Sequence, residues 1–286
     1  MTAVPGLSAD IESMLLERGW AVVDLPDPSP VRSAREWLLT ELRKSLPSLE
    51  ALEKYHRILD DERHISVVHD VAERFWAARY GHQVIAANVA FFRGLLGPDL
   101  HVQHYPYLRV VRPDHVEDAV PLHRDTYYGA SPFEVSALVP LTEMKSASAL
   151  RAIPGSHVEP DSAYPFVQTE SSDVAFGSAR HKLGYAYAPR LLDPSLDARA
   201  EPIPVSVGQM LIFSLSLVHG GGANASEETR FSTDIRIVNS HAPVSFSRGV
   251  RADYYVPLCA SPISVSASRF LAANRPAEPA SSGARA

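Results

Sequence analysis

The sequence has little cysteine, no long apolar run and no excess of positive charge. Cys259 is the only cysteine among 286 residues, so an intrachain disulfide or a site with several thiolate ligands cannot form. Any bound metal must therefore be held by histidine and carboxylate side chains. No stretch approaches the roughly 20 apolar residues of a membrane-spanning helix, and the N-terminus carries acids where a secretory signal carries basic residues. We expect a cytoplasmic protein with no membrane partner.

The balance of charge argues against a nucleic-acid partner. The chain has 27 basic and 33 acidic residues and a formal net charge of −6, whereas proteins that neutralise phosphates usually gather an excess of basic residues. Hydrophobic residues make up 45% and charged residues 21%, an ordinary composition for a globular protein. We expect a monomer or homodimer whose partner is a small-molecule substrate.

The first hundred residues are patterned mainly as helices. Between residues 8 and 97, apolar residues recur at intervals of three and four, most clearly over 68–79 and 83–96. Ser8 suits the N-cap of a first helix over 8–18, and residues 20–25 form an apolar run that is typical of a strand.

After this helical part, the pattern changes to short strands. The candidate strands cover residues 102–111, 120–128, 134–141, 149–153, 203–205, 209–214, 229–238 and 252–256. Such a series predicts an antiparallel sandwich or jelly-roll barrel over about 100–260, and hence a mainly β fold with helical additions packed outside.

Two segments stand apart from the barrel. Residues 157–202 are rich in Pro, Ser, Tyr and Ala, and form a long connection of the kind that serves as a lid over a site. Residues 274–286 consist mainly of Ala, Pro, Ser and Arg, and are expected to form a disordered tail. Since no internal repeat is present, we predict a single domain over 1–270.

Three residues suggest a metal site. His123 and Asp125 are two apart in a candidate strand, so both side chains should leave the same face. An isolated His-x-Asp is common, and without context it is most simply a surface histidine beside an acid. A second candidate strand, 208–219, delivers His219 at its end. Two imidazoles and one carboxylate form the facial triad of non-haem Fe(II) enzymes, with zinc as the chemical alternative.

The strand that starts at Arg230 suggests a second ligand. Residues 230, 232, 234 and 236 are polar, and a strand with one polar face turned into a barrel explains this alternation. A guanidinium and a hydroxyl, from Arg230 and Ser232, can hold a carboxylate, as a dicarboxylate co-substrate on the metal would require. Arg236 shares this face and is either an alternative anchor or the ion-pair partner of Asp234.

Further residues are candidates for the pocket wall. They are Gln103, Tyr105, Tyr107, Arg109, Tyr127, Tyr128 and Arg236. Gln103 and Tyr105 are the candidates for contact with the dicarboxylate, and the others for contact with substrate, although aromatic stripes in sheets more often serve packing. Arg124 lies between two candidate ligands in a strand and should therefore point to the surface.

The order of these motifs resembles the phytanoyl-CoA dioxygenase-like branch of the Fe(II)/2-oxoglutarate-dependent oxygenases. The segments that carry the resemblance are His123-x-Asp125, Ala149-Leu-Arg-Ala-Ile-Pro-Gly-Ser-His157, His219-Gly-Gly-Gly-Ala-Asn-Ala-Ser226 and Arg230-x-Ser232. The resemblance covers about residues 10–260 and implies a double-stranded β-helix of the cupin type. It also implies Fe(II) on His123, Asp125 and His219, with Arg230 and Ser232 on the distal carboxylate of 2-oxoglutarate. Family members often have Asn-Gly where this chain has Ser146-Ala-Ser148, which includes none of these ligands.

The activity that the resemblance implies is hydroxylation of a C–H bond with O2, with release of succinate and CO2. The expected substrate is a small polar or natural-product-like metabolite of secondary metabolism. Related halogenases replace the carboxylate ligand with a small residue, so Asp125 argues for hydroxylation. The same site could instead catalyse desaturation, cyclisation or epimerisation. A cupin-like metalloenzyme that does not use 2-oxoglutarate, and a non-catalytic barrel, are the other classes considered.

Overall fold

A large antiparallel sheet forms the centre of the protein. The computed structural model describes residues 8–167, 190–243 and 254–274. The strands of this sheet are β1 (Trp20–Asp24), β2 (Leu100–Gln103), β3 (Tyr107–Val111), β4 (Val135–Pro140), β9 (Gln209–Ser214), β11 (Arg230–Asn239) and β12 (Tyr255–Cys259). They lie in the order β1-β9-β4-β11-β2-β12, and β3 also pairs with β11. Every pair is antiparallel.

A smaller sheet lies across a cavity from the large one. Its strands are β5 (Leu150–Ala152), β8 (Glu201–Ile203) and β10 (His219–Gly221), in the order β10-β5-β8. The cavity is lined from both sheets, by Leu150 and His219 on one side and Arg230 on the other. A two-stranded ribbon of β6 (Phe166–Val167) and β7 (Arg190–Leu191) lies beside them. This sandwich of antiparallel sheets agrees with the predicted barrel.

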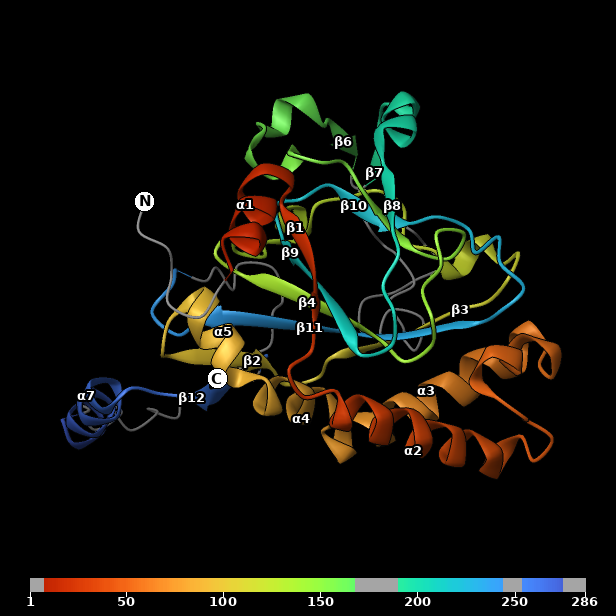
Figure 1. Cartoon of the computed structure of the whole chain (residues 1–286), viewed down its shortest axis with the longest axis horizontal. Helices are drawn as coiled ribbons and strands as arrows, with labels where there is room; N and C mark the ends of the chain where they lie inside the picture. The colour runs from red at the N-terminus through yellow and green to blue at the C-terminus, as the bar shows by residue number, and fades with distance from the viewer. Residues whose placement is uncertain (1–7, 168–189, 244–253, 275–286) are drawn as a thin grey trace, which may run out of the picture.

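Helices cover the face of the large sheet that is turned away from the cavity. The α-helices are α1 (Ala9–Arg18), α2 (Ser29–Ser45), α3 (Asp61–Ala78), α4 (Tyr80–Ala87), α5 (Val89–Leu96) and α7 (Pro262–Ala273). The 3-10 turns are η1 (Leu52–Arg57), η2 (Val116–Asp118), η3 (Asp125–Tyr128), η4 (Ser156–Val158), η5 (Asp161–Ala163) and η6 (Pro194–Arg199). In Figure 1, α2, α3 and α4 run together along one side of the sheet, whereas α7 lies apart at the far end.

β11 has an apolar face toward the helices and a polar face toward the cavity. Phe231, Ile235 and Ile237 are fully buried in the core that α2 to α5 complete. The Phe231 ring meets the Tyr55 ring of η1 edge-on, with centroids 5.5 Å apart. On the opposite face, Arg230, Asp234 and Arg236 line the cavity. The strand therefore separates an apolar core from a polar cavity.

The prediction of a mainly β fold is wrong in its proportions. Helical segments account for 42% of the described residues, because the N-terminal part is helical and 3-10 turns occupy many loops. The N-cap at Ser8 is confirmed, since its Oγ accepts the Ile11 N–H at 3.3 Å. The strand predicted over 102–111 is broken into β2 and β3 at Pro106, which has no N–H to pair. Helix α7 was not foreseen.

Two further strand predictions are wrong around the motif residues. Residues 120–128 do not form a strand, because His123 makes only an isolated bridge and η3 begins at Asp125. Residues 208–219 are not one strand, because β9 ends at Ser214 and His219 opens β10 after a turn.

Parts of two predicted segments fall beyond what the structure describes. Residues 168–189 of the lid-like connection and residues 275–286 of the tail lie outside the described residues. Within the described ranges, no helix combines the length and the apolar character needed to cross a membrane. The single-domain boundary at residue 270 stays a prediction.

Candidate metal centre

Two histidines are fixed by the backbone of the opposite segment. The N–H of His123 donates to the carbonyl of His219, and the N–H of His219 donates to the carbonyl of His123, both at 2.9 Å. Gly220 follows directly, and a Cβ atom there would lie 2.7 Å from the Pro121 carbonyl oxygen. Only glycine permits this close approach of two backbones. The bridge therefore joins two segments that are far apart in the sequence.

Backbone carbonyls also fix the tautomers of these histidines. The Nδ1–H of His123 donates to the Pro121 carbonyl at 2.8 Å, and that of His219 donates to the Leu217 carbonyl at 3.0 Å. Because a carbonyl only accepts, Nδ1 must carry the proton in both rings. Each Nε2 is then a lone-pair donor, which is the form that binds a metal.

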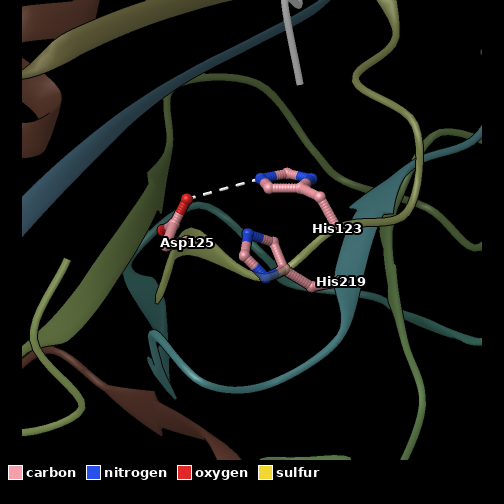
Figure 2. Close-up of side chains that lie close together, drawn as sticks. All are labelled: His123, Asp125 and His219. Carbon is pink, nitrogen blue, oxygen red and sulfur yellow. Dashed lines mark ion pairs between the residues drawn. The ribbon is translucent and has the colours of Figure 1, made fainter. Parts of the chain in front are cut away.

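Asp125 completes a buried group of three. Its Oδ1 lies 3.4 Å from His123 Nε2 and 3.1 Å from a guanidinium nitrogen of Arg236. Figure 2 shows Asp125, His123 and His219 converging on one point. Their ligand atoms all lie within 4.8 Å of one another, and each residue is at least nine-tenths buried. This set of donors fits a divalent metal of the non-haem iron type.

The electrostatics of the site favour the metal-binding protonation states. Burial, with a smaller contribution from His123, lowers the pKa of His219 to about 4, although Asp125 opposes the shift. Burial alone would raise the pKa of Asp125, but the Arg236 guanidinium, His123 and His219 bring that pKa well below its usual range. At neutral pH, His219 is therefore neutral and Asp125 is ionised.

The polar face of β11 supplies the groups next to this triad. The cavity has a volume of about 50 Å³ and is lined by Arg230, Asp234 and Arg236 from this strand. A terminal nitrogen of Arg230 donates to the Ser148 carbonyl at 2.7 Å. The Nε of Arg230 and the Oγ of Ser232 are buried and have no hydrogen-bond partner among the described residues. Burial, opposed by Asp234 and helped by Arg109, lowers the pKa of Arg230 to about 10. A buried cation with a free donor is suited to a carboxylate.

The ion pairs on this face differ from the predicted ones. Arg236 contacts Asp125, whereas Asp234 Oδ2 accepts a hydrogen bond from Arg109 Nε at 2.7 Å. The pairing of Arg236 with Asp234 is therefore not formed. Arg236 belongs to the triad, and Arg230 lies at the other end of the polar face.

The structure brings only some of the predicted wall residues to the cavity. Tyr107 and Arg109 line it. Gln103 does not, because its side chain accepts the Arg236 N–H at 3.1 Å and donates to the Tyr105 carbonyl at 3.0 Å. The Tyr105 ring instead stacks on His104, with ring centroids 4.1 Å apart.

Tyr127, the first of the two tyrosines that follow Asp125, is also not among the described lining residues. Tyr127 donates to the Tyr164 carbonyl at 2.9 Å, and its ring stacks on Phe166 with centroids 3.8 Å apart. The side chain of Tyr128 lies outside what the structure describes, although its backbone ends η3.

Arg124 is buried, so the prediction that it points to the surface is wrong. Only 2% of this residue is exposed. Its guanidinium donates to the carbonyls of Ser156 and Glu159, at 2.5 and 2.9 Å, and pairs with Asp161. Its Cζ atom also lies over the Tyr164 ring, 4.7 Å from the ring centroid. The backbone of Arg124 is extended, but the segment 156–164 covers the side that its guanidinium faces, so an alternating residue that was expected at the surface is buried.

Comparisons with known proteins agree with this geometry. The sequence profile of the family described as phytanoyl-CoA dioxygenase (PhyH) matches residues 17–232. A comparison with curated proteins finds no match. The solved apo structure of the non-heme monooxygenase ThoJ is 20% identical, with a TM-score of 0.55 over 88% of this chain and 84% of that one.

A second solved structure has the same fold. The non-heme alpha ketoglutarate dependent carbocyclase SnoK, from nogalamycin biosynthesis, is 16% identical, with a TM-score of 0.53 over 88% of this chain and 91% of that one. These likenesses establish the fold, and the profile match spans well over half of the sequence. The chain belongs to the phytanoyl-CoA dioxygenase family of Fe(II)/2-oxoglutarate-dependent dioxygenases.

Proposed function

We propose that this protein is an Fe(II)/2-oxoglutarate-dependent oxygenase that hydroxylates a C–H bond of a small polar or natural-product-like metabolite. Iron and 2-oxoglutarate are the cofactors of its family. The observation that carries the proposal is the convergence of His123, Asp125 and His219 within 4.8 Å at the cavity. In this role the two Nε2 atoms and the Asp125 carboxylate hold Fe(II), and the remaining coordination positions are open to 2-oxoglutarate and O2.

Arg230 and Ser232 have the properties of a site for the distal carboxylate of 2-oxoglutarate. Their unpartnered Nε and Oγ atoms are buried donors close together on β11. A buried guanidinium without a counter-ion is costly, so an incoming carboxylate gains a strong charge-assisted contact. Arg236 is the weaker candidate for this role because it already contacts Asp125.

The other residues of the site position the metal ligands or contact the substrate. Fe(II) with 2-oxoglutarate supplies oxygen activation, in which 2-oxoglutarate, O2 and the substrate C–H give succinate, CO2 and the alcohol. Arg236 holds the Asp125 carboxylate toward the histidines, and the Pro121 and Leu217 carbonyls hold the imidazoles. Tyr107 and Arg109 are proposed to contact the substrate, because both line the cavity. Asp125 occupies the position that a halide would need, which favours hydroxylation over halogenation.

Several other features of this proposal extend beyond the metal centre. Contacts from Gln103, Tyr105, Tyr127 or Tyr128 to ligands, a cytoplasmic location, and a monomeric or homodimeric state stay predictions. Desaturation, cyclisation or epimerisation would use the same protein groups and would differ in where the substrate places its reacting C–H bond. A 2-oxoglutarate-independent metalloenzyme is the alternative that the first experiment must separate.

The test is an anaerobic titration of the Fe(II)-loaded protein with 2-oxoglutarate, followed by the weak visible charge-transfer band of the chelated keto acid. We expect the band in the wild type. Arg230→Ala should need about a hundredfold more 2-oxoglutarate, since a charge-assisted pair is lost. Arg93→Ala is the matched control, because Arg93 is exposed on α5 and away from the cavity.

Two results would contradict the proposal. A wild type that binds Fe(II) and shows no band would favour the 2-oxoglutarate-independent metalloenzyme. An unchanged requirement for 2-oxoglutarate in Arg230→Ala would move the carboxylate site to Arg236.

A further inference from the structure

Asp234 has a carboxylate oxygen that the fold leaves unsatisfied. It lies on the polar face of β11 and lines the cavity. Its Oδ2 accepts from Arg109 at 2.7 Å, but its Oδ1 is buried and has no hydrogen-bond partner in the described part of the chain. A buried acceptor without a donor destabilises the folded protein. A molecule that fills the cavity and supplies a donor would recover this free energy.

The position of Asp234 separates it from the 2-oxoglutarate end of the face. In the sheet it pairs with Tyr107 on one side and Leu138 on the other, and both of these residues line the cavity. It lies between Ser232, proposed for the distal carboxylate, and Arg236, which contacts Asp125. 2-Oxoglutarate is a dianion at neutral pH and has no hydrogen-bond donor, so it cannot satisfy Oδ1. The donor must come from the other ligand of the cavity.

The charges around Asp234 select the kind of donor. Arg109 already compensates the Asp234 carboxylate and Arg236 pairs with Asp125, whereas the Arg230 guanidinium lines the same cavity with no ion-pair partner among the described residues. An ammonium group would gain little from a compensated carboxylate and would be repelled by the Arg230 guanidinium. A neutral hydroxyl can donate to Oδ1 without adding charge.

We propose that Asp234 is a specificity-determining residue whose Oδ1 accepts a hydrogen bond from a neutral hydroxyl group of the substrate. The substrate class is therefore a hydroxylated molecule, with that hydroxyl held beside the metal-binding triad, and not an amine. This inference rests on the proposed function, because it takes the cavity to be the substrate site.

The experiment compares three small probes with the same carbon ring: cyclohexanol, cyclohexylammonium and methylcyclohexane. Binding to the protein loaded with Zn(II) and 2-oxoglutarate is measured by saturation-transfer NMR, since zinc is redox-inert and diamagnetic. We expect the wild type to prefer cyclohexanol over both other probes by about tenfold, as for a hydrogen bond to a charged group. In Asp234→Leu, the preference for cyclohexanol over methylcyclohexane should fall to about one.

Two further variants test whether a lost preference for cyclohexanol is specific to the Asp234 carboxylate. Asp234→Asn keeps the side-chain volume and an acceptor oxygen, and should retain part of the preference. Asp70→Asn, at an exposed aspartate of α3, is the matched control and should behave as the wild type. The inference is overturned if the wild type prefers cyclohexylammonium, if it binds no cyclohexanol, or if Asp234→Leu keeps the full preference.

The charge-transfer titration separates this inference from the proposed function. A wild type without the band removes the proposed function and the inference together. A wild type with the band but without the cyclohexanol preference removes the inference alone. If Asp234→Asn loses the band, Asp234 acts on 2-oxoglutarate instead of the substrate, and the inference is overturned.

Discussion

The two faces of β11 differ in the kind of side chain that they carry. On the face toward the helices, Phe231 and Ile235 are fully buried among apolar side chains. On the face toward the cavity, Arg230, Ser232 and Asp234 each have a buried polar atom with no partner among the described residues. On the helix side the Thr233 hydroxyl is also buried without a partner among the described residues, so the strand carries mostly apolar packing on one side and several unsatisfied polar groups on the other. The comparison indicates that the helical layer offsets the free-energy cost of a polar cavity.

The largest expected effect is on the cavity side, at the metal centre. His219→Ala removes one of two imidazole donors, so Fe(II) binding and turnover should both fall by at least about a thousandfold. His69→Ala is the control, since His69 lies on α3 and not at the cavity. Metal binding by equilibrium dialysis and succinate release measure the effect. Full Fe(II) affinity in His219→Ala would remove this residue from the triad.

On the helix side, Phe231→Ala should lower the free energy of unfolding and leave the affinity for 2-oxoglutarate nearly unchanged. Removing this fully buried ring should cost about 3–5 kcal/mol of unfolding free energy through lost burial and a new cavity. Denaturant unfolding measures the loss, and titration of the folded protein should give an affinity for 2-oxoglutarate within about twofold of the wild type. A large loss of affinity at unchanged stability would contradict the division between the two faces.

The helical layer has a weakness of its own in acid. Burial, with Arg79 and His104, lowers the pKa of His82 from 6.5 to about 4, so the unfolded chain binds a proton more readily than the folded one. The contribution of His82 to the free energy of unfolding is fully present above pH 6.5. It is lost as the pH falls toward 4, by up to about 3 kcal/mol.

The variant His82→Leu should therefore flatten the fall in unfolding free energy between pH 6.5 and 4. His241→Leu is a suitable control, because the side chain of His241 is 65% exposed. Denaturant unfolding at several pH values measures both variants. An unchanged pH profile in His82→Leu would show that other groups cause the acid sensitivity.

The smallest expected effect tests the residue next to Phe231. Ser232→Ala removes a buried hydroxyl that has no partner among the described residues, so stability should stay constant or rise slightly. The affinity for 2-oxoglutarate should fall about tenfold, as for one lost hydrogen bond. Together, Phe231→Ala and Ser232→Ala form a matched pair on adjacent residues. If Ser232→Ala lowered the free energy of unfolding and kept the full affinity for 2-oxoglutarate, Ser232 would have a structural role and no role in ligand binding.

The sequence was most informative where residue type alone constrains chemistry. The grouping of His123, Asp125 and His219 followed from ligand chemistry and motif order, and the polar face of β11 followed from alternation along one real strand. The family, the enzyme class and the cofactors are confirmed. Asp234 could have been found by the same alternation, but its unsatisfied oxygen is visible only in the structure.

Arguments from alternation failed where the chain leaves regular geometry or is covered by another segment. Pro106 interrupts the predicted strand, so Gln103 and Tyr105 do not share the cavity with Tyr107. Arg124 keeps an extended backbone, but the segment 156–164 covers its side chain, so it is buried at a position predicted to be at the surface. Such breaks depend on tertiary contacts, which local patterns cannot specify.

The hydrogen bonds that fix the imidazoles of His123 and His219 have a consequence for the history of this site. Both Nδ1–H groups donate to main-chain carbonyls, at Pro121 and Leu217, and every residue type has such a carbonyl. Substitutions elsewhere in the cavity wall can therefore accumulate without disturbing the tautomers of the metal donors. The two histidine donors are therefore insulated from changes in the cavity wall, whereas Asp125 depends on Arg236, and the remainder of the wall is free to diversify toward new substrates.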